Sequence, residues 1–220
     1  MKLLLTSAGI TNDAIAEALS ILAGGPLSEL SIIHIPTAAN TEAGDKGWVI
    51  DDLIRLKSCN FKSIDILDVA AVSPEIWKAR IQEADIISFG GGNEQYLAKV
   101  FEKIGMKDFL ISALSTKVYM GTSAGSMVAG QYLSRGLLKV VYPEEDFGDS
   151  LENPMKFYDF SFIPHLNSKW FTKVRKEILE SIKDKLDYSV YATDDETAIK
   201  IDGNKIEIVG EGKSWVFNKI

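Results

Sequence analysis

The sequence of 220 residues contains one cysteine, Cys59, and two histidines, His34 and His165. A single cysteine cannot form a disulfide within the chain, which excludes a disulfide-stabilised secreted scaffold and leaves Cys59 as a small buried or half-buried side chain. Two distant histidines without a His-Glu-x-x-His pattern do not make a zinc site. The residues therefore predict neither a bound metal nor a cofactor.

The sequence also lacks long hydrophobic runs and clusters of basic residues. No apolar stretch approaches the roughly 20 residues that a membrane-spanning helix needs. The first ten residues are too short for the hydrophobic core of a signal peptide and favour a first strand. The formal net charge of −7 argues against nucleic acid as a main partner. We expect a soluble, cytoplasmic protein, monomeric or homodimeric, that binds neither membrane nor nucleic acid.

Short apolar runs alternate with amphipathic stretches along the first half of the chain. Hydrophobic residues make up 46% of the sequence, which is ample for a core, and no linker or repeat divides residues 1–220 into more than one predicted domain. Strand-like runs alternate with helical patterns. The strand-like runs occupy residues 2–7, 29–36, 63–69, 85–92 and 117–123, and the helical patterns occupy residues 13–22, 47–56, 74–83, 95–104 and 107–114. This order indicates an α/β fold of three layers, a mostly parallel sheet with helices on both faces.

The alternation ends near Leu137. Residues 142–161 form an acidic, aromatic segment that we interpret as an irregular insertion near the ligand cleft, where it restricts access. Strands at residues 160–164 and 188–194, with a helix at residues 169–185 between them, are predicted next. The tail, residues 197–217, predicts short antiparallel strands with a turn at Asp202-Gly203-Asn204.

The sequence "VYMGTSAGSM", residues 118–127, places Ser123 between Gly121 and Gly125. A Gly-x-Ser-x-Gly pattern after a strand and before a helix is typical of a nucleophile elbow, a strained turn that exposes the serine Oγ. The alternative is a glycine-rich turn with an idle serine. The N–H of Ala124, at the start of the following helix, is a candidate donor to an oxyanion.

A serine nucleophile needs a base, and the chain offers two histidines. His34 lies inside an apolar strand and is expected to be a core histidine. His165 directly follows Pro164 at the end of a strand, which is a suitable position for a catalytic base, although an exposed loop histidine is the alternative.

Three adjacent carboxylates follow another strand, and one of them is expected to orient the base. They are Asp194, Asp195 and Glu196, and strand alternation puts Asp195 on the face opposite the other two. An acidic turn that starts a hairpin is the alternative. More distant candidates for the acid are Asp146, Asp149 and Asp159.

Three consecutive glycines, Gly90 to Gly92, follow the strand "DIISF". Glycines allow the backbone to approach a ligand closely, so this turn is a candidate for the second oxyanion donor. A phosphate-binding role is the alternative, but the spacing matches neither of the common glycine-rich phosphate loops.

Taken together, these motifs resemble the S51 serine peptidases, a family that includes aspartyl dipeptidases and cyanophycinases. The resemblance covers most of the chain and rests on "SFGGGN", "MGTSAGSM", "IPHLN" and "ATDDETAI" in this order. It implies a fold related to class I glutamine amidotransferases, with a short antiparallel hairpin at the C-terminus. The order Ser, His, acid also differs from the order Ser, acid, His of α/β-hydrolases. An amidotransferase has a cysteine at the elbow, where this chain has Ser123.

The resemblance implies Ser123 as the nucleophile, His165 as the base, and the N–H groups of Gly92 and Ala124 as oxyanion donors. The position of the family's acid corresponds to Asp195, with Glu196 as the alternative. Candidates for substrate binding are Asn93 and, for the acidic side chain of an Asp-X dipeptide, the basic residues Lys173 and Arg175.

The sequence thus predicts a serine peptidase that hydrolyses dipeptides or short peptides. Two alternatives stay open. An esterase or amidase for a small acyl compound would use the same three side chains, and a binding protein would retain an idle elbow.

Overall fold

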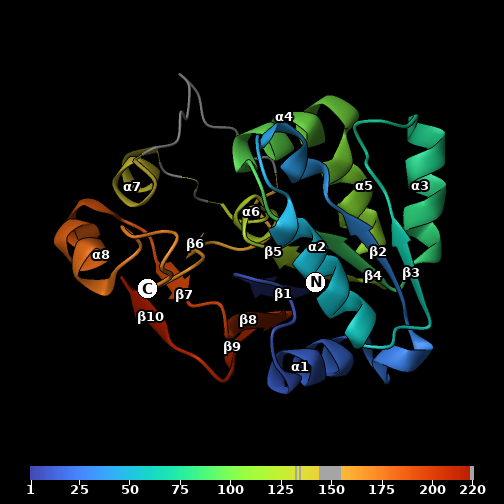
Figure 1. Cartoon of the computed structure of the whole chain (residues 1–220), viewed down its shortest axis with the longest axis horizontal. Helices are drawn as coiled ribbons and strands as arrows, with labels where there is room; N and C mark the ends of the chain where they lie inside the picture. Colours follow the sequence, from blue (N-terminus) through green and yellow to red (C-terminus); the bar gives the residue numbers. More distant parts are fainter. Residues whose placement is uncertain (132, 134, 144–154, 219–220) are drawn as a thin grey trace.

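The central feature of the computed structural model, which describes residues 1–131, 133, 135–143 and 155–218, is a sheet of seven strands in the order β3-β2-β4-β5-β1-β8-β9 (Figure 1). Five strands are parallel: β1 (Lys2–Thr6), β2 (Ser31–Ile35), β3 (Ser63–Ile66), β4 (Ile86–Phe89) and β5 (Val118–Thr122). The C-terminal hairpin of β8 (Thr197–Asp202) and β9 (Lys205–Gly210) extends the sheet on the far side of β1 in the antiparallel direction.

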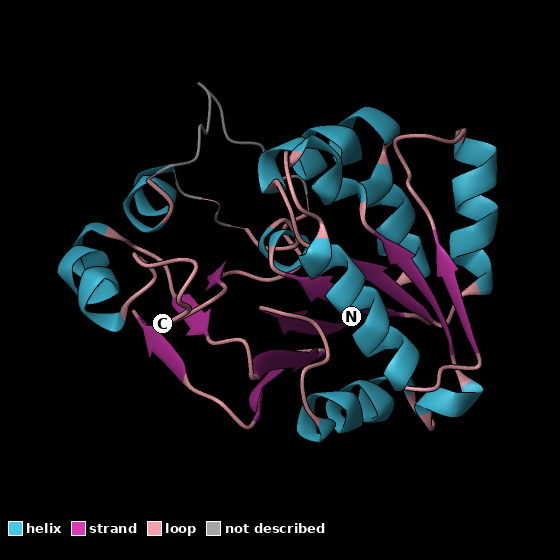
Figure 2. Ribbon diagram, viewed as in Figure 1, coloured by secondary structure: helices cyan, strands magenta, loops and turns pink. Residues whose placement is uncertain are grey.

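Helices cover both faces of this sheet (Figure 2). Alternate residues of β1 show why: Leu4 belongs to the buried cluster that contains Ile15 of α1 on one face, whereas Leu3 and Leu5 belong to the cluster on the other face. One face carries α1 (Asp13–Ala23) and α2 (Gly47–Ser58), and the other carries α3 (Pro74–Glu83), α4 (Glu94–Ile104), α5 (Met106–Ala113) and α6 (Ala124–Met127). The predicted three-layer, mostly parallel fold is therefore confirmed.

A second, three-stranded sheet lies beside the first (Figure 1). Its order is β10-β7-β6, with β6 parallel to β7 and β10 antiparallel to it. The strands are β6 (Ser161–Ile163), β7 (Val190–Thr193) and β10 (Ser214–Phe217), with α7 (Arg135–Val141) and α8 (Lys176–Ile182) nearby. The predicted antiparallel tail is correct for β8 and β9, but β10 leaves that hairpin and pairs with β7.

The predicted helix at residues 169–185 is wrong in its first part. Residues 169–175 form turns, α8 begins at Lys176, and a short 3-10 helix covers Lys183–Lys185. The turns are held because Val174 is buried and its carbonyl accepts the N–H of Asn167, and because the guanidinium of Arg175 donates to nearby carbonyls. Tertiary packing thus overrides an amphipathic pattern in this segment.

The helix after the elbow is short. α6 ends at Met127, and Gly130 then forms an isolated bridge with Tyr158. A Cβ at Gly130 would lie 2.6 Å from the Tyr158 ring, so this turn needs a glycine.

Other 3-10 turns cover Leu27–Glu29 and Thr37–Thr41. The predicted acidic insertion, residues 142–161, falls partly outside the described residues, since 144–154 are not among them. The candidate acids Asp146 and Asp149 lie in this part. Among the residues that the structure does describe, none of the helices has the length and apolar character needed to cross a membrane.

The elbow is joined to the centre of the sheet by a buried serine. Ser126 Oγ accepts the backbone N–H of Thr6 at 3.0 Å and donates to the Thr6 carbonyl at 2.9 Å. The same carbonyl accepts the N–H of Ser123 at 2.9 Å. The end of β1 and the start of α6 are therefore fixed relative to each other by hydrogen bonds in a water-free environment.

We expect Ser126→Ala to destabilise the protein, because it leaves the buried N–H of Thr6 without its acceptor. The expected loss in the free energy of unfolding is about 1–3 kcal/mol, measured by urea denaturation. The matched control is Ser115→Ala, since Ser115 is exposed and bonds only to the carbonyl of Ser112 in its own turn. Equal stabilities of the two variants would contradict this account of the elbow.

Candidate active site

Ser123 lies in the sharp turn between β5 and α6, and its backbone is strained. Its φ of 48° and ψ of −110° fall in a region that a residue with a Cβ rarely adopts. A Cβ at Gly121 would lie 2.6 Å from the Cα of Ser126, and one at Gly125 would lie 2.7 Å from the carbonyl carbon of Phe89. Both glycines are therefore required for the tight turn, as the Gly-x-Ser-x-Gly pattern predicts.

The pairing of β6 with β7 brings His165 and Asp195 together. The two strands are parallel, with Ile163 opposite Ala192, so the residues that follow each strand emerge at the same edge. His165 comes two residues after β6 and Asp195 two residues after β7. The three-stranded sheet thus places the imidazole of His165 and the carboxylate of Asp195 side by side.

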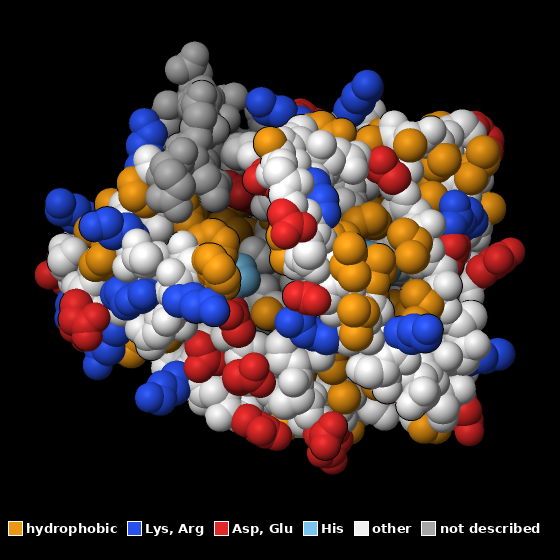
Figure 3. Space-filling model, in the orientation of Figure 1, with side chains coloured by type: hydrophobic (Ala, Val, Ile, Leu, Met, Phe, Trp, Pro, Cys, Tyr) orange, Lys and Arg blue, Asp and Glu red, His pale blue; other side chains and the backbone are white. Residues whose placement is uncertain are grey.

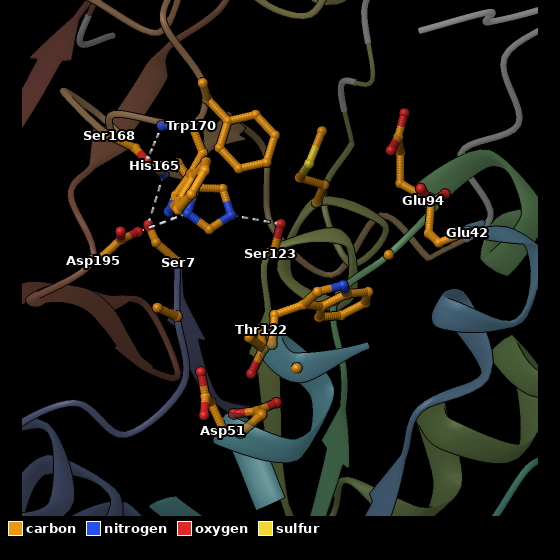
Figure 4. A pocket seen from close by; sticks show the side chains of 18 of the residues that line it. Ser7, Glu42, Asp51, Glu94, Thr122, Ser123, His165, Ser168, Trp170 and Asp195 are labelled. Carbon is orange, nitrogen blue, oxygen red and sulfur yellow. Dashed lines mark hydrogen bonds and ion pairs between the residues drawn. The ribbon is translucent and has the colours of Figure 1, made fainter. Parts of the chain in front are cut away.

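The three side chains form one hydrogen-bonded series (Figure 4). His165 Nε2 lies 3.0 Å from Ser123 Oγ, and His165 Nδ1 lies 2.6 Å from Asp195 Oδ1. The ring of Phe171 stacks on the imidazole with centroids 4.5 Å apart and planes 14° apart. The imidazole is therefore held by a partner at each nitrogen and by an aromatic ring on its face.

Ser7 connects the two sheets at this point. It follows β1, and its hydroxyl donates to the carbonyl of Thr193 in β7 at 2.9 Å and accepts the backbone N–H of His165 at 3.1 Å. Ser7 is fully buried, so these bonds are protected from water. The sequence pattern gave no reason to select this serine, although it too follows a strand.

The structure separates the three neighbouring carboxylates. Asp194 accepts from the N–H groups of Glu196 and Lys213 and from the hydroxyl of Thr197, which makes it a turn-stabilising residue. Glu196 accepts from the side chain of Asn12 on the outer surface. Asp195 is the one whose carboxylate meets His165.

Two further N–H groups are available for an oxyanion. Within the described part of the chain, the backbone N–H groups of Gly92 and Ala124 have no hydrogen-bond acceptor. Gly92 adopts a φ of 129°, and a Cβ there would meet the backbone of Ala38, so only glycine fits. A Cβ at Gly91 would lie 3.5 Å from the Cβ of Ser123, which shows how closely the glycine turn approaches the elbow.

The predicted substrate-binding residues do not reach the cavity beside Ser123. Asn93 is the N-cap of α4, and its side chain accepts the N–H of Tyr96 at 2.8 Å. The guanidinium of Arg175 donates to the carbonyls of Ser168, Phe171 and Val174. Neither of these residues, nor the exposed Lys173, is among those that line the cavity. The resemblance suggested these positions, but hydrogen bonds within the fold engage Asn93 and Arg175.

A cavity of about 750 Å³ opens beside Ser123 and His165. Figure 3 shows it as a hollow with a histidine side chain exposed inside it and acidic side chains around it. Aromatic side chains of Trp48, Trp170 and Phe171 line it together with the residues directly after β1, residues of α2 and the glycine turn. This volume is in the range of sites that bind small molecules.

Two buried carboxylates in the cavity wall were not selected from the sequence. Asp52 of α2 is 6% exposed and Glu94 of α4 is 4% exposed. Burial raises the pKa of Asp52 to about 6, against a smaller opposing effect of Arg55, and burial raises the pKa of Glu94 to about 7. An amphipathic helix pattern gives no sign that an acidic residue faces inward, so only the structure reveals them.

His34 is a core histidine, as expected from its strand. It is 1% exposed, its Nδ1 lies 3.1 Å from the hydroxyl of Ser88, and its Nε2 lies 4.0 Å from Asp52 Oδ2. Burial lowers the pKa of His34 to about 4, so its ring is neutral at ordinary pH. In the parts of the chain that are described, His, Cys, Asp and Glu side chains form no group of three or more suited to a metal ion.

Comparison with known proteins gives consistent results. The family model described as Peptidase family S51 matches residues 3–209. A curated protein from Streptomyces coelicolor, Peptidase E, is 24% identical over 142 residues, which cover 64% of this chain and 58% of that protein. The match therefore spans less than two thirds of the length of this relative.

Two solved structures have the same fold. One is a candidate peptidase E from Listeria monocytogenes EGD-e, with a TM-score of 0.75, 21% identity, and coverage of 96% of this chain and 98% of that one. The other is a peptidase from an acI-B1 Actinobacterium, with a TM-score of 0.70, 22% identity, and coverage of 97% and 88%.

The buried carboxylate of Glu94 leads to a stability prediction. The folded protein, with a Glu94 pKa of about 7 against an ordinary value of 4.5, binds more protons than the unfolded chain between these pH values. The contribution of Glu94 to stability is therefore lost as pH rises through about 7. We expect the stability of Glu94→Gln relative to wild type to increase by roughly 1–3 kcal/mol from pH 5 to pH 8.

The measurement is chemical denaturation of both proteins across this pH range. Glu102→Gln is the matched control, because Glu102 is exposed on the same helix. A difference between wild type and Glu94→Gln that does not change with pH would show that the Glu94 carboxyl has an ordinary pKa.

Proposed function

Because this chain belongs to peptidase family S51, we propose that it is a serine peptidase that hydrolyses dipeptides or short peptides. The observation that carries the proposal is the hydrogen-bonded series Ser123–His165–Asp195, with distances of 3.0 Å and 2.6 Å, at the edge of a cavity. A nucleophile, a base and an orienting acid in this order are the requirements for acyl transfer.

In the first half of the proposed reaction, Ser123 Oγ attacks the carbonyl carbon of the scissile peptide bond. His165 Nε2 accepts the proton of the hydroxyl as the new C–O bond forms. Asp195 accepts the Nδ1–H of His165, which fixes the tautomer with a free Nε2 and stabilises the imidazolium. The N–H groups of Gly92 and Ala124 donate to the oxyanion of the tetrahedral intermediate.

In the second half, the intermediate collapses and the peptide C–N bond breaks. His165 Nε2 donates its proton to the leaving amine, and an acyl ester remains on Ser123. Water then attacks this ester while His165 accepts its proton, and the acid product leaves as Ser123 regains its hydrogen.

The size of the cavity supports small substrates. Its volume of about 750 Å³ lies in the range of small-molecule sites and is sufficient for a dipeptide or a short peptide. A preference for Asp-X dipeptides would need a cation at the cavity to receive the acidic side chain. Among the described lining residues, Arg55 is the only one with a lysine or arginine side chain.

The first test of the proposal is the loss of the nucleophile. We expect Ser123→Ala to abolish hydrolysis of a dipeptide panel and to prevent labelling by a fluorophosphonate probe, because no other side chain carries the reactive oxygen. Parallel assays with simple esters separate a peptidase from an esterase. Undiminished dipeptide hydrolysis by the variant would refute the assignment of Ser123.

The second test compares the two adjacent acids. We expect Asp195→Asn to lower kcat by about 10³–10⁴, because an amide at this position favours the wrong imidazole tautomer. Glu196→Gln is the matched control, and its kcat should stay within about twofold of wild type, as expected for an exposed side chain away from His165. The reverse pattern would assign the role of the acid to Glu196.

A further inference from the structure

The wall of the cavity is strongly acidic. Carboxylates project from the loop before α2, from α2, from the start of α4 and from the turn after β7: Glu42, Asp45, Asp51, Asp52, Glu94 and Asp195. Within the described lining, the guanidinium of Arg55 is the only permanent cation. A charge distribution of this kind attracts cations and repels anions, and the low dielectric of a cavity strengthens both effects.

Glu94 is the carboxylate with the clearest need of a partner. Its side chain is 4% exposed, and its Oε1 accepts no hydrogen bond from any described residue. Figure 4 shows Glu94 beside Glu42 at one end of the cavity, away from Asp195 and the labelled part of α2. Burial is the main cause of the raised pKa of Glu94, and repulsion from Glu42 makes a smaller contribution. A bound cation between the two carboxylates would remove this repulsion and supply the missing donor.

A second buried carboxylate, that of Asp52, has one oxygen without a partner in the described part of the chain. Asp52 Oδ1 is buried without a hydrogen-bond donor among the described residues, and so is the neighbouring hydroxyl oxygen of Thr122. Both atoms face Gly9, since a Cβ on this glycine would meet Asp52 Oδ1 and lie 3.6 Å from Thr122 Oγ1. Thr122 directly precedes Ser123, and Asp52, Thr122 and Ser123 line the same cavity. Buried polar atoms without a partner are rare, and a ligand is one explanation for them.

The aromatic side chains of the cavity are compatible with a cationic ligand. Trp48 lines the cavity and has the ammonium group of Lys46 5.8 Å from its ring centroid, and Trp170 lines it with the ammonium of Lys169 at 4.8 Å. Indole rings attract cations through their negative faces. These rings therefore already lie beside cations of the protein itself, and they offer apolar surface to the alkyl portion of a ligand side chain.

We propose that the cavity selects dipeptides with an N-terminal lysine or arginine, whose α-ammonium group is received by Asp52 and Thr122 and whose side-chain cation is received by Glu94 and Glu42. The assignment follows from reach. The α-ammonium group is attached to the carbon next to the attacked carbonyl, so it must lie near Ser123, whereas a long side chain extends to the far end of the cavity. This inference rests on the proposed peptidase function, because it names the substrate class of the same site.

The decisive measurement is binding to the inactive Ser123→Ala protein, which leaves the dipeptide intact. Isothermal titration at pH 8 and low ionic strength compares Lys-Ala, Ala-Ala, Asp-Ala and N-acetyl-Lys-Ala. We expect Lys-Ala to bind about tenfold or more tightly than Ala-Ala, as for one gained charge-assisted hydrogen bond. Asp-Ala should bind most weakly among the three free dipeptides, and acetylation of Lys-Ala should weaken its binding.

Substitutions then separate the two carboxylates. Adding Glu94→Gln should reduce the affinity for Lys-Ala by about tenfold and leave that for Ala-Ala unchanged, whereas adding Asp52→Asn should reduce both. Glu102→Gln, the exposed control on α4, should change neither. Thermal unfolding of each variant verifies that it is folded.

Three results would overturn the inference. In the first, Asp-Ala binds most tightly and Arg55→Gln abolishes this binding. In the second, Glu94→Gln and Glu102→Gln have equal effects on the affinity for Lys-Ala. In the third, none of the four ligands binds. Hydrolysis by the wild type keeps the two proposals distinct. If Ala-Ala is cleaved as efficiently as Lys-Ala, the substrate class is wrong and the peptidase function stands. If Lys-Ala binds selectively but is never cleaved, the ligand class stands and the peptidase function is wrong.

Discussion

The arrangement of the site depends on the hydroxyl group of Ser7. The nucleophile follows a strand of the seven-stranded sheet, whereas the histidine and the acid follow strands of the three-stranded one. Their geometry therefore requires the two sheets to be held in a fixed position relative to each other. Ser7 does this with one buried oxygen, which bonds to the backbone of His165 and of Thr193. Ser126 holds the elbow to the end of β1 on the neighbouring side. Because Thr6 is the last residue of β1 and Ser7 follows it directly, two consecutive residues at the end of this strand fix both halves of the site.

This dependence explains how much of the site could be predicted from the sequence. Ser123, His165 and Asp195 each follow a strand, and the carboxyl ends of parallel strands share one edge of a sheet. The pattern therefore predicts that the three side chains meet at the edge of one sheet, whereas in the structure Ser123 follows a strand of the large sheet and the other two follow strands of the small one. The two glycines of the elbow also indicate a tight turn, because only glycine fits beside Ser126 and Phe89.

The features that were missed depend on contacts that no local pattern encodes. The turns at residues 169–175 are held by the burial of Val174 and by hydrogen bonds from Arg175 to carbonyl groups. The spacing of hydrophobic residues in the sequence gives no indication of these contacts. β10 pairs with β7 rather than with its neighbour in the sequence. Glu94 occupies the first turn of α4, where an acidic residue is normally explained by the helix dipole, so its burial in a cavity leaves no trace in the sequence.

The acidic wall also bears on the chemistry proposed for Ser123. A tetrahedral oxyanion that forms among several carboxylates is raised in energy by their field, and the N–H groups of Gly92 and Ala124 must overcome this repulsion. A cation on the substrate reduces the negative charge of the wall when it binds, before any bond is broken. In an acidic cavity, the positive charge of the substrate therefore acts twice, once in binding and once in stabilising the transition state. Such an enzyme distinguishes cationic from neutral substrates through kcat as well as through KM. With a neutral substrate, the negative field of the carboxylates acts on the oxyanion without compensation.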